Sequence, residues 1–135
     1  MSRPAGHPAA IFGALGRDRT GATAVEFALT VLPLLLLLCG IPEFGRLLWT
    51  QTTLHFAVEA AARCGSIDAV QCGSTGAVQN FAAAHAVGIG LSPAAVAVTA
   101  ASCGTAVSAS YPFQFVVTGF FPYAITLTAQ TCFPK

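Results

Sequence analysis

The hydrophobic pattern begins with one long apolar run behind a polar, Gly- and Pro-rich start. No charged residue occurs from Phe27 to Pro42, but a helix that crosses the hydrocarbon of a membrane takes about 20 residues. A helix over 22–41 has that length and places Glu26 in its second turn. The pattern therefore predicts a transmembrane helix that carries one costly carboxylate inside the membrane.

Beyond Pro42, apolar residues keep a helical spacing as far as Arg63, which predicts a helical extension over 42–64 that ends at Gly65. Ser74-Thr75 then offers an N-cap for a second helix that continues through Val87. An isolated extension of this length is only marginally stable in water. We therefore expect it to pack against its own domain or against neighbouring subunits.

From residue 96 the period of the pattern changes to two. Apolar and polar positions alternate over 96–101, 113–118 and 125–130, with turns expected at Gly104-Thr105 and over 119–123. Three such strands predict a small antiparallel sheet that buries one face against the two helices. The fold class expected is α+β, with residues 65–135 as a small domain outside the membrane.

Charge and composition support a membrane anchor. Only 8% of the residues are charged and 55% are hydrophobic, whereas about a quarter are charged in ordinary soluble domains. Arg3, Arg17 and Arg19 precede the apolar run, so the positive-inside rule keeps residues 1–21 cytoplasmic as a leader and exports the C-terminal domain. The net charge of +1 shows no basic cluster, which makes nucleic acid an unexpected partner.

Five cysteines agree with export. Cys39 lies in the apolar run, and the other four lie in the exported part: Cys64, Cys72, Cys103 and Cys132. Disulfides are favoured over zinc because no C-x2-C or H-x3-H spacing is present. Cys64 and Cys72 can close a local loop. Cys103 and Cys132 end the first and third predicted strands, about 9.5 Å apart in a meander and beyond the roughly 7 Å reach of a disulfide, unless the strand ends splay or the strand order differs.

Catalytic residues are sparse. His55 and Glu59 are four residues apart and could pair as base and orienter, but a solvated helix pair is the more ordinary interpretation. No nucleophile elbow, phosphate-binding loop or H-E-x-x-H motif occurs. The sequence predicts neither an enzyme nor a metal or cofactor site.

Ordinary export signals are also missing. A signal peptide would end in a small-x-small cleavage site, whereas the apolar run leads into Cys39-Gly40-Ile41-Pro42-Glu43. A lipoprotein site at Cys39 would need a small residue before the cysteine, and Leu38 stands there.

The border between the basic leader and the apolar run carries a more specific pattern. Gly21, four residues and then Glu26-Phe27 resemble the processing site of type IV prepilins. Together with three further blocks, the segment resembles the TadE family of Tad/Flp pilus systems. These blocks are Pro33-Leu34-Leu35, Glu43-Phe44-Gly45-Arg46 and Glu59-Ala60-Ala61-Ala62-Arg63.

The resemblance implies cleavage between Gly21 and Ala22 by a membrane-embedded prepilin peptidase, with Glu26 and Phe27 as part of the recognised site. It implies a minor pilin or pseudopilin in the bacterial inner membrane, with the N-terminus cytoplasmic and the domain periplasmic. Its partners would be the bilayer, other pilin subunits and the inner-membrane assembly platform. The alternative is an unprocessed, single-span periplasmic interaction module, in which Glu26 only snorkels toward the membrane surface.

Overall fold

A computed structural model describes residues 20–116 and 124–134. The chain divides into two compact units, residues 1–40 and residues 41–135, and each is described by itself. Helix α2 spans Thr20–Ile67 and so contributes to both units. It continues past Gly65, where the sequence predicts its end. The predicted leader, residues 1–21, lies almost entirely outside the described residues.

The second unit has the predicted α+β composition. Helix α3 spans Thr75–His85, and the Oγ of Ser74 accepts a hydrogen bond from the Ala77 N–H, which confirms the predicted N-cap. The helix ends at His85, slightly before the predicted Val87, and the Ala86 N–H closes it on the Ala82 carbonyl. A short 3₁₀ turn, η1 (Pro93–Ala95), leads into the sheet.

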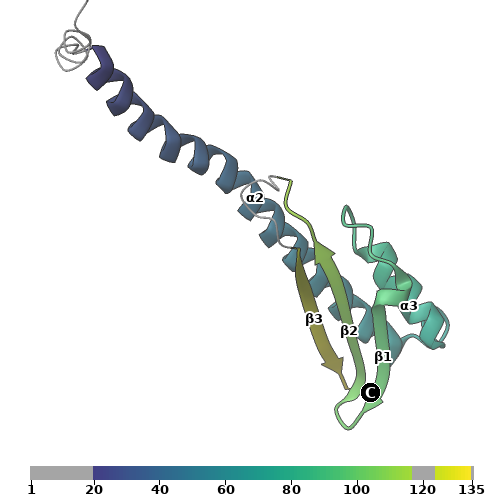
Figure 1. The fold of residues 1–135 in the computed structure, drawn as a ribbon. Helices are drawn as coiled ribbons and strands as arrows, with labels where there is room; N and C mark the ends of the chain where they lie inside the picture. Colours follow the sequence, from purple (N-terminus) through teal and green to yellow (C-terminus); the bar gives the residue numbers. More distant parts are fainter. Residues whose placement is uncertain (1–19, 117–123, 135) are drawn as a thin grey trace, which may run out of the picture. The chain divides into compact units, whose positions relative to one another are not determined.

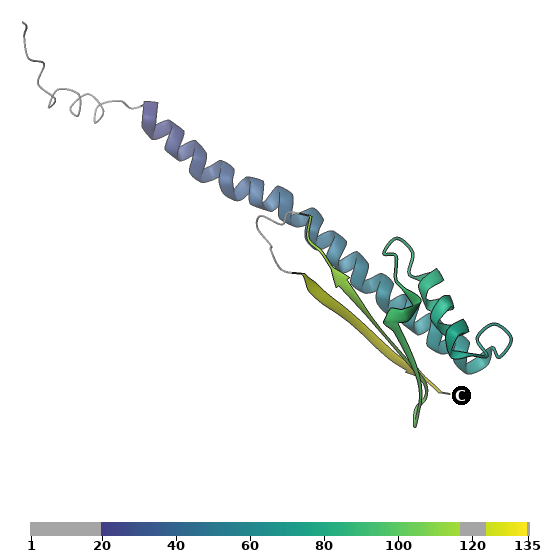
Figure 2. The ribbon, with the colours of Figure 1, turned by 45° about the vertical axis from the view of Figure 1, so that its right-hand side comes forward.

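The sheet has three antiparallel strands in the order β1-β2-β3. Strand β1 covers Val96–Ala101, β2 Gly104–Phe113 and β3 Ile125–Phe133, and Figure 2 shows them side by side. The outer strands agree with the prediction, but the middle one does not. Gly104-Thr105 begins β2 and is not a turn, and residues 114–116 follow the strand. The predicted turn over 119–123 lies outside the described residues.

The middle strand escaped prediction because its inward residues are small. Thr105, Val107 and Ala109 are buried, but they alternate with Ala and Ser, so the contrast in hydrophobicity is weak. Pro112 adds a misleading signal, since proline is rare in central strands. A backbone N–H at residue 112 would point to the side of β2 that faces β1. Strand β1 begins only at Val96, which pairs with Ala109, so β1 does not extend as far as residue 112. The missing N–H of Pro112 therefore removes no ladder bond.

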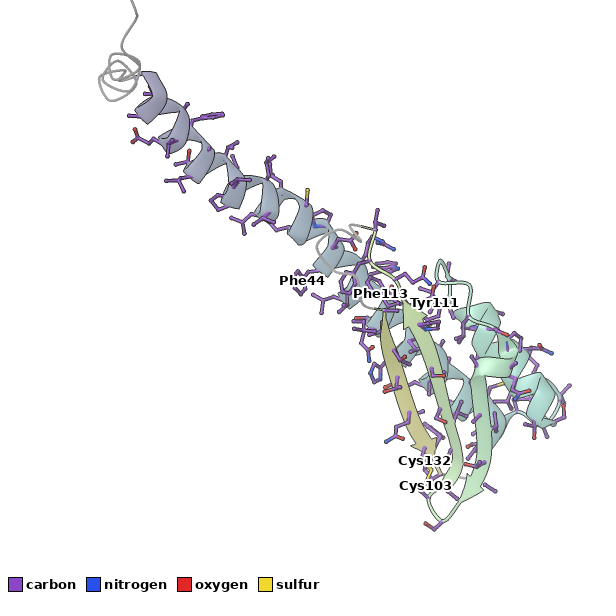
Figure 3. All side chains as sticks on the ribbon, viewed as in Figure 1. Phe44, Cys103, Tyr111, Phe113 and Cys132 are labelled. Carbon is purple, nitrogen blue, oxygen red and sulfur yellow. A yellow bond between two sulfur atoms is a disulfide. The ribbon has the colours of Figure 1, made fainter. Side chains whose placement is uncertain are left out.

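Two disulfides close the second unit. Cys64 bonds to Cys72, with the Cα atoms 5.7 Å apart, and Cys103 bonds to Cys132, at 6.2 Å. The second bond forms although the strand order is the simple meander, because Cys103 lies in the β1–β2 turn and not in β1. The turn brings it beside the end of β3, as Figure 3 shows. The possible Cys103–Cys132 disulfide is therefore present, and it does not need a different strand order.

The core of the second unit lies between α2, α3 and the inner face of the sheet. The buried residues of α2 follow a helical stripe, Leu54, Ala57, Val58, Ala61 and Ala62. Against them pack two residues of α3 and the inner residues of the strands, namely Val78, Ala82, Val96, Val107, Ala109, Phe113, Leu127 and Ala129.

Candidate functional site

The predicted processing residues lie in the first turns of α2. Gly21, Ala22, Glu26 and Phe27 are all helical and exposed. A Cβ added at Gly21 would meet nothing within 4 Å, so packing in the described structure does not require glycine there.

The apolar run of α2 has no covering in the described structure. From Phe27 to Leu38 the leucine side chains are about half to two-thirds exposed, and Phe27 itself is 67% exposed. Helix α2 is long and apolar enough to cross a membrane. A surface of this kind is stable only in an apolar environment, which a bilayer or neighbouring helices supply.

Glu26 stands within this uncovered surface. Among the described residues, none pairs with its carboxylate. The nearby hydroxyl of Thr30 donates instead to the backbone carbonyls of Phe27, at 2.9 Å, and Glu26, at 3.2 Å. The geometry leaves the carboxylate available to a cation from outside the described residues.

A second acidic residue lies in a different environment, at the start of the stripe by which α2 faces the sheet. Glu43 is only 5% exposed. Its Oε2 accepts a hydrogen bond from Arg46 Nη1 at 3.0 Å, and its Oε1 accepts the backbone N–H of Val116 at 2.8 Å. The carboxylate thereby ties the helix to the segment that follows β2 and satisfies a backbone donor there.

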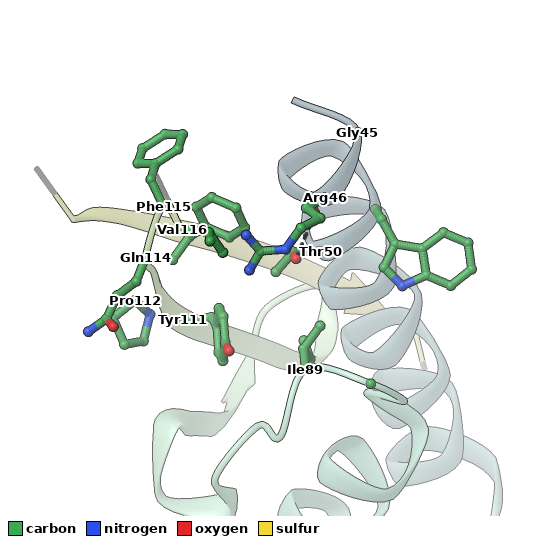
Figure 4. A pocket seen from close by; sticks show the side chains of 12 residues that line it. Gly45, Arg46, Thr50, Ile89, Tyr111, Pro112, Gln114, Phe115 and Val116 are labelled. Atoms are coloured by element: carbon green, nitrogen blue, oxygen red, sulfur yellow. Dashed lines mark hydrogen bonds between the residues drawn. The ribbon is translucent and has the colours of Figure 1, made fainter. Parts of the chain in front are cut away.

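Arg46 continues this polar cluster into a pocket of about 850 Å³. Its guanidinium lies over the Phe113 ring, 5.3 Å from the ring centroid. Figure 4 shows Arg46 between α2 and the aromatic residues at the end of β2. The pocket is also lined by Trp49 and Tyr111. Arg46 is the only cationic residue among the described residues that line the pocket, and its charge is paired with the Glu43 carboxylate.

The histidines and the remaining acids within residues 20–116 and 124–134 do not converge. His55 Nε2 lies 2.9 Å from Gln51 Nε2, and Gln51 also donates to the Thr128 carbonyl at 3.0 Å. His55 therefore accepts from Gln51 and does not pair with Glu59. His85 stacks on Phe81 and contacts its carbonyl oxygen. In the part of the chain that the structure describes, no three His, Cys, Asp or Glu residues gather as metal ligands.

Sequence reasoning missed the role of Glu43 and Gln51. In the sequence, Glu43 was identified only as part of the block Glu43-Phe44-Gly45-Arg46. Its position relative to Leu47, Thr50 and Leu54 places it on the helix face that is buried. Glu43 lies on the buried face of the helix, and Arg46 follows it by three residues. This spacing could have predicted a buried ion pair.

Comparison with known proteins agrees with the resemblance noted from the sequence. No curated protein and no solved structure gives a significant match to the chain. Residues 21–63 match the family described as TadE-like protein. This range begins at Gly21, includes the buried Glu43 and ends at Arg63. Residues 21–63 are therefore a TadE-like segment.

Proposed function

We propose that this protein is a minor pilin or pseudopilin that takes part in assembly of a Tad/Flp-type pilus in the bacterial inner membrane. The observation that carries the proposal is the TadE-like match beginning at Gly21, with Glu26 on the uncovered apolar part of α2. The function is association: the apolar helix packs among other pilin helices and the bilayer, and residues 41–135 lie in the periplasm. Its partners are prepilin peptidase, other subunits and the assembly platform.

Processing gives the costly carboxylate of Glu26 a purpose. Cleavage after Gly21 creates a new amine on Ala22, one helical turn from Glu26. That amine, from the same subunit or a neighbour, neutralises the carboxylate inside the membrane. A neighbour's amine would also fix the register of one subunit against the next. In the alternative, a permanently anchored module, the Glu26 carboxylate only snorkels toward the membrane surface.

N-terminal sequencing of the protein from the membrane fraction separates the two proposals. We expect Ala22 as the first residue if the chain is a processed pilin-like subunit. Met1 as the first residue, in cells with an active prepilin peptidase, would show that the chain is an unprocessed anchor.

Gly21→Leu should block cleavage, because a side chain at the scissile bond obstructs the close approach of the protease to the backbone. The expected result is accumulation of the longer precursor on an electrophoretic gel. Gly40→Leu is the matched control, since an added Cβ at Gly40 also meets nothing within 4 Å. If both variants are cleaved as fast as the unmodified chain, residue 21 is not the scissile position.

Glu26→Ala should leave insertion and cleavage intact and reduce pilus assembly by about tenfold or more, since losing one favourable contact of roughly 1.4 kcal/mol changes an equilibrium tenfold. Glu26→Gln tests the charge at constant shape and should be equally impaired. Thr30→Val is the control, because its hydroxyl bonds only local carbonyls. Normal piliation in the Glu26→Ala variant would show that the Glu26 charge does not fix the register between subunits.

A further inference from the structure

Four exposed apolar side chains lie where the second unit begins. Ile41 is the last residue of the predicted transmembrane span and the first residue of the second unit. Phe44, Leu48 and Trp49 follow on α2, and Val116 follows β2. All four side chains are more than half exposed, although water is an unfavourable environment for them. We call Phe44, Leu48, Trp49 and Val116 the proximal collar.

The proximal collar occupies several sides of α2 at one level. Successive residues of an α-helix turn by about 100°, so the side chains of Phe44 and Trp49 point about 140° apart, with Leu48 between them. Glu43 lies on the buried face of the helix, and its Oε1 accepts the Val116 N–H at 2.8 Å. Val116 therefore adds an exposed apolar side chain beside the remaining face. The collar is a level band and not a stripe along the helix.

The distance of the collar from Ile41 matches the headgroup layer of a bilayer, which is about 5 to 7 Å thick on each side of the hydrocarbon. An α-helix rises about 1.5 Å per residue, so the Cα atom of Trp49 lies about 12 Å beyond that of Ile41. Helical side chains lean about one turn toward the N-terminus, which brings the indole ring back to about 7 Å. Phe44 lies nearer to Ile41, and so does Val116 through its bond to Glu43. A tilt of the helix only shortens these distances from the membrane.

The charges near the collar are compatible with lipid phosphates. Glu43 is the only acid between Ile41 and Glu59, and it is buried and paired with Arg46. Arg46 keeps half of its side chain exposed, and a cation at this level is attracted to anionic headgroups. The first exposed acid on this part of α2 is Glu59, about 27 Å beyond Ile41 along the axis. No exposed carboxylate of α2 therefore lies at the level of the headgroups on this side of the span.

A bilayer explains this arrangement better than a second helix does. A neighbouring helix covers one stripe that continues along its partner, whereas the collar spans several sides of α2 within about two turns. Further along the helix Phe56 is also exposed, but it lies about 22 Å beyond Ile41, past the headgroup layer. Tryptophan favours the headgroup layer because its ring is apolar and its N–H is polar. The level, the charges and Trp49 all agree with lipid as the occupant.

We propose that the proximal collar inserts into the periplasmic headgroup layer of the membrane that α2 crosses. The inference rests on the membrane anchoring proposed above, but not on processing or on pilus assembly. The collar side chains contact the upper part of the lipid chains, and the indole N–H of Trp49 remains among the headgroups. This contact holds the start of the second unit on the membrane surface and sets the depth of the span, as interfacial aromatic residues do.

Trp49 is the only tryptophan of the chain, so its fluorescence reports directly on the collar. The full-length protein is reconstituted in vesicles of phosphatidylethanolamine and phosphatidylglycerol that contain lipids with a nitroxide quencher, either near the headgroup or deep in the acyl chain. We expect the shallow quencher to remove about half or more of the Trp49 fluorescence and the deep quencher to remove less.

The variant Trp49→Phe with Phe56→Trp is the matched control. It moves the tryptophan by two helical turns, about 10 Å, along the same side of α2, to a position that is also exposed. Residue 56 lies past the headgroup layer, so neither lipid quencher should lower the fluorescence of this variant appreciably.

Flotation of the protein with the vesicles separates this inference from the proposed anchoring. Protein that floats but whose Trp49 is not quenched by either lipid overturns the collar and leaves the anchoring intact, whereas protein that does not float overturns both. Stronger quenching by the deep lipid, or equal quenching at residues 49 and 56, overturns the placement at the headgroup level. Quenching that appears only when the protein is diluted in lipid would make a second copy the occupant and would also overturn the proposal.

Discussion

Gly104→Ala is expected to lower the free energy of unfolding by more than about 3 kcal/mol, because two costs add at one atom. Gly104 has a φ of 127°, which a residue with a side chain rarely adopts, and a Cβ there would overlap the Phe133 carbonyl oxygen. The end of β3 would have to move, together with the Cys103–Cys132 disulfide beside it. Thermal unfolding of the full-length protein in detergent, followed by circular dichroism, measures the loss.

Gly88→Ala separates the two costs. Gly88 also has a positive φ, 82°, but an added Cβ meets nothing within 4 Å. It should therefore lose only the conformational term, about 1 kcal/mol. Equal losses of unfolding free energy in the two variants would mean that the overlap of the added Cβ with the Phe133 carbonyl costs nothing. The end of β3 would then not hold the β1–β2 turn tightly.

Glu43→Ala is expected to destabilise the second unit by about 2 to 3 kcal/mol, in the range for a hydrogen bond to a buried charge. The variant leaves the Val116 N–H without its acceptor, but half of the Arg46 side chain is exposed and can be solvated, which limits the loss. Chemical denaturation of the full-length protein, with tryptophan fluorescence of Trp49 as the signal, reports on this region.

Glu59→Ala is the matched control, an exposed acid on the same helix, and should change stability by less than about 0.5 kcal/mol. Glu43→Gln keeps an acceptor for the Val116 N–H and should recover part of the loss. If Glu43→Ala and Glu59→Ala unfold alike, the contacts of Glu43 do not hold the segment after β2 in place.

Features that depend on local sequence were predictable. Neighbouring residues in the sequence are enough to identify the apolar run, the helical spacing to Arg63 and the Ser74 cap. The structure contains the corresponding helices. The outer strands were predictable for the same reason, since Val and Leu contrast with Ala and Thr along them. The TadE-like segment was recognisable because its blocks lie close together.

Features that depend on contacts across the fold were not predictable. Strand β2 is central because Val107 and Ala109 meet β1 and β3, although its sequence of small residues resembles a loop. The Cys103–Cys132 pairing depends on that strand, because only its early start moves Cys103 into a turn. The role of Glu43 depends on Val116, far away in the sequence. Local patterns carry no information about such partners.

The polar links between α2 and the sheet bear on how this domain responds to force. Glu43 with Val116, Gln51 with Thr128 and Ser66 with Phe133 join the helix to the sheet at successive heights. A pull along the axis of α2 would load all three links at once, in shear, together with the apolar stripe between them. Peeling the helix away sideways would break them one after another. The domain should therefore resist tension applied along its helix far better than tension applied across it.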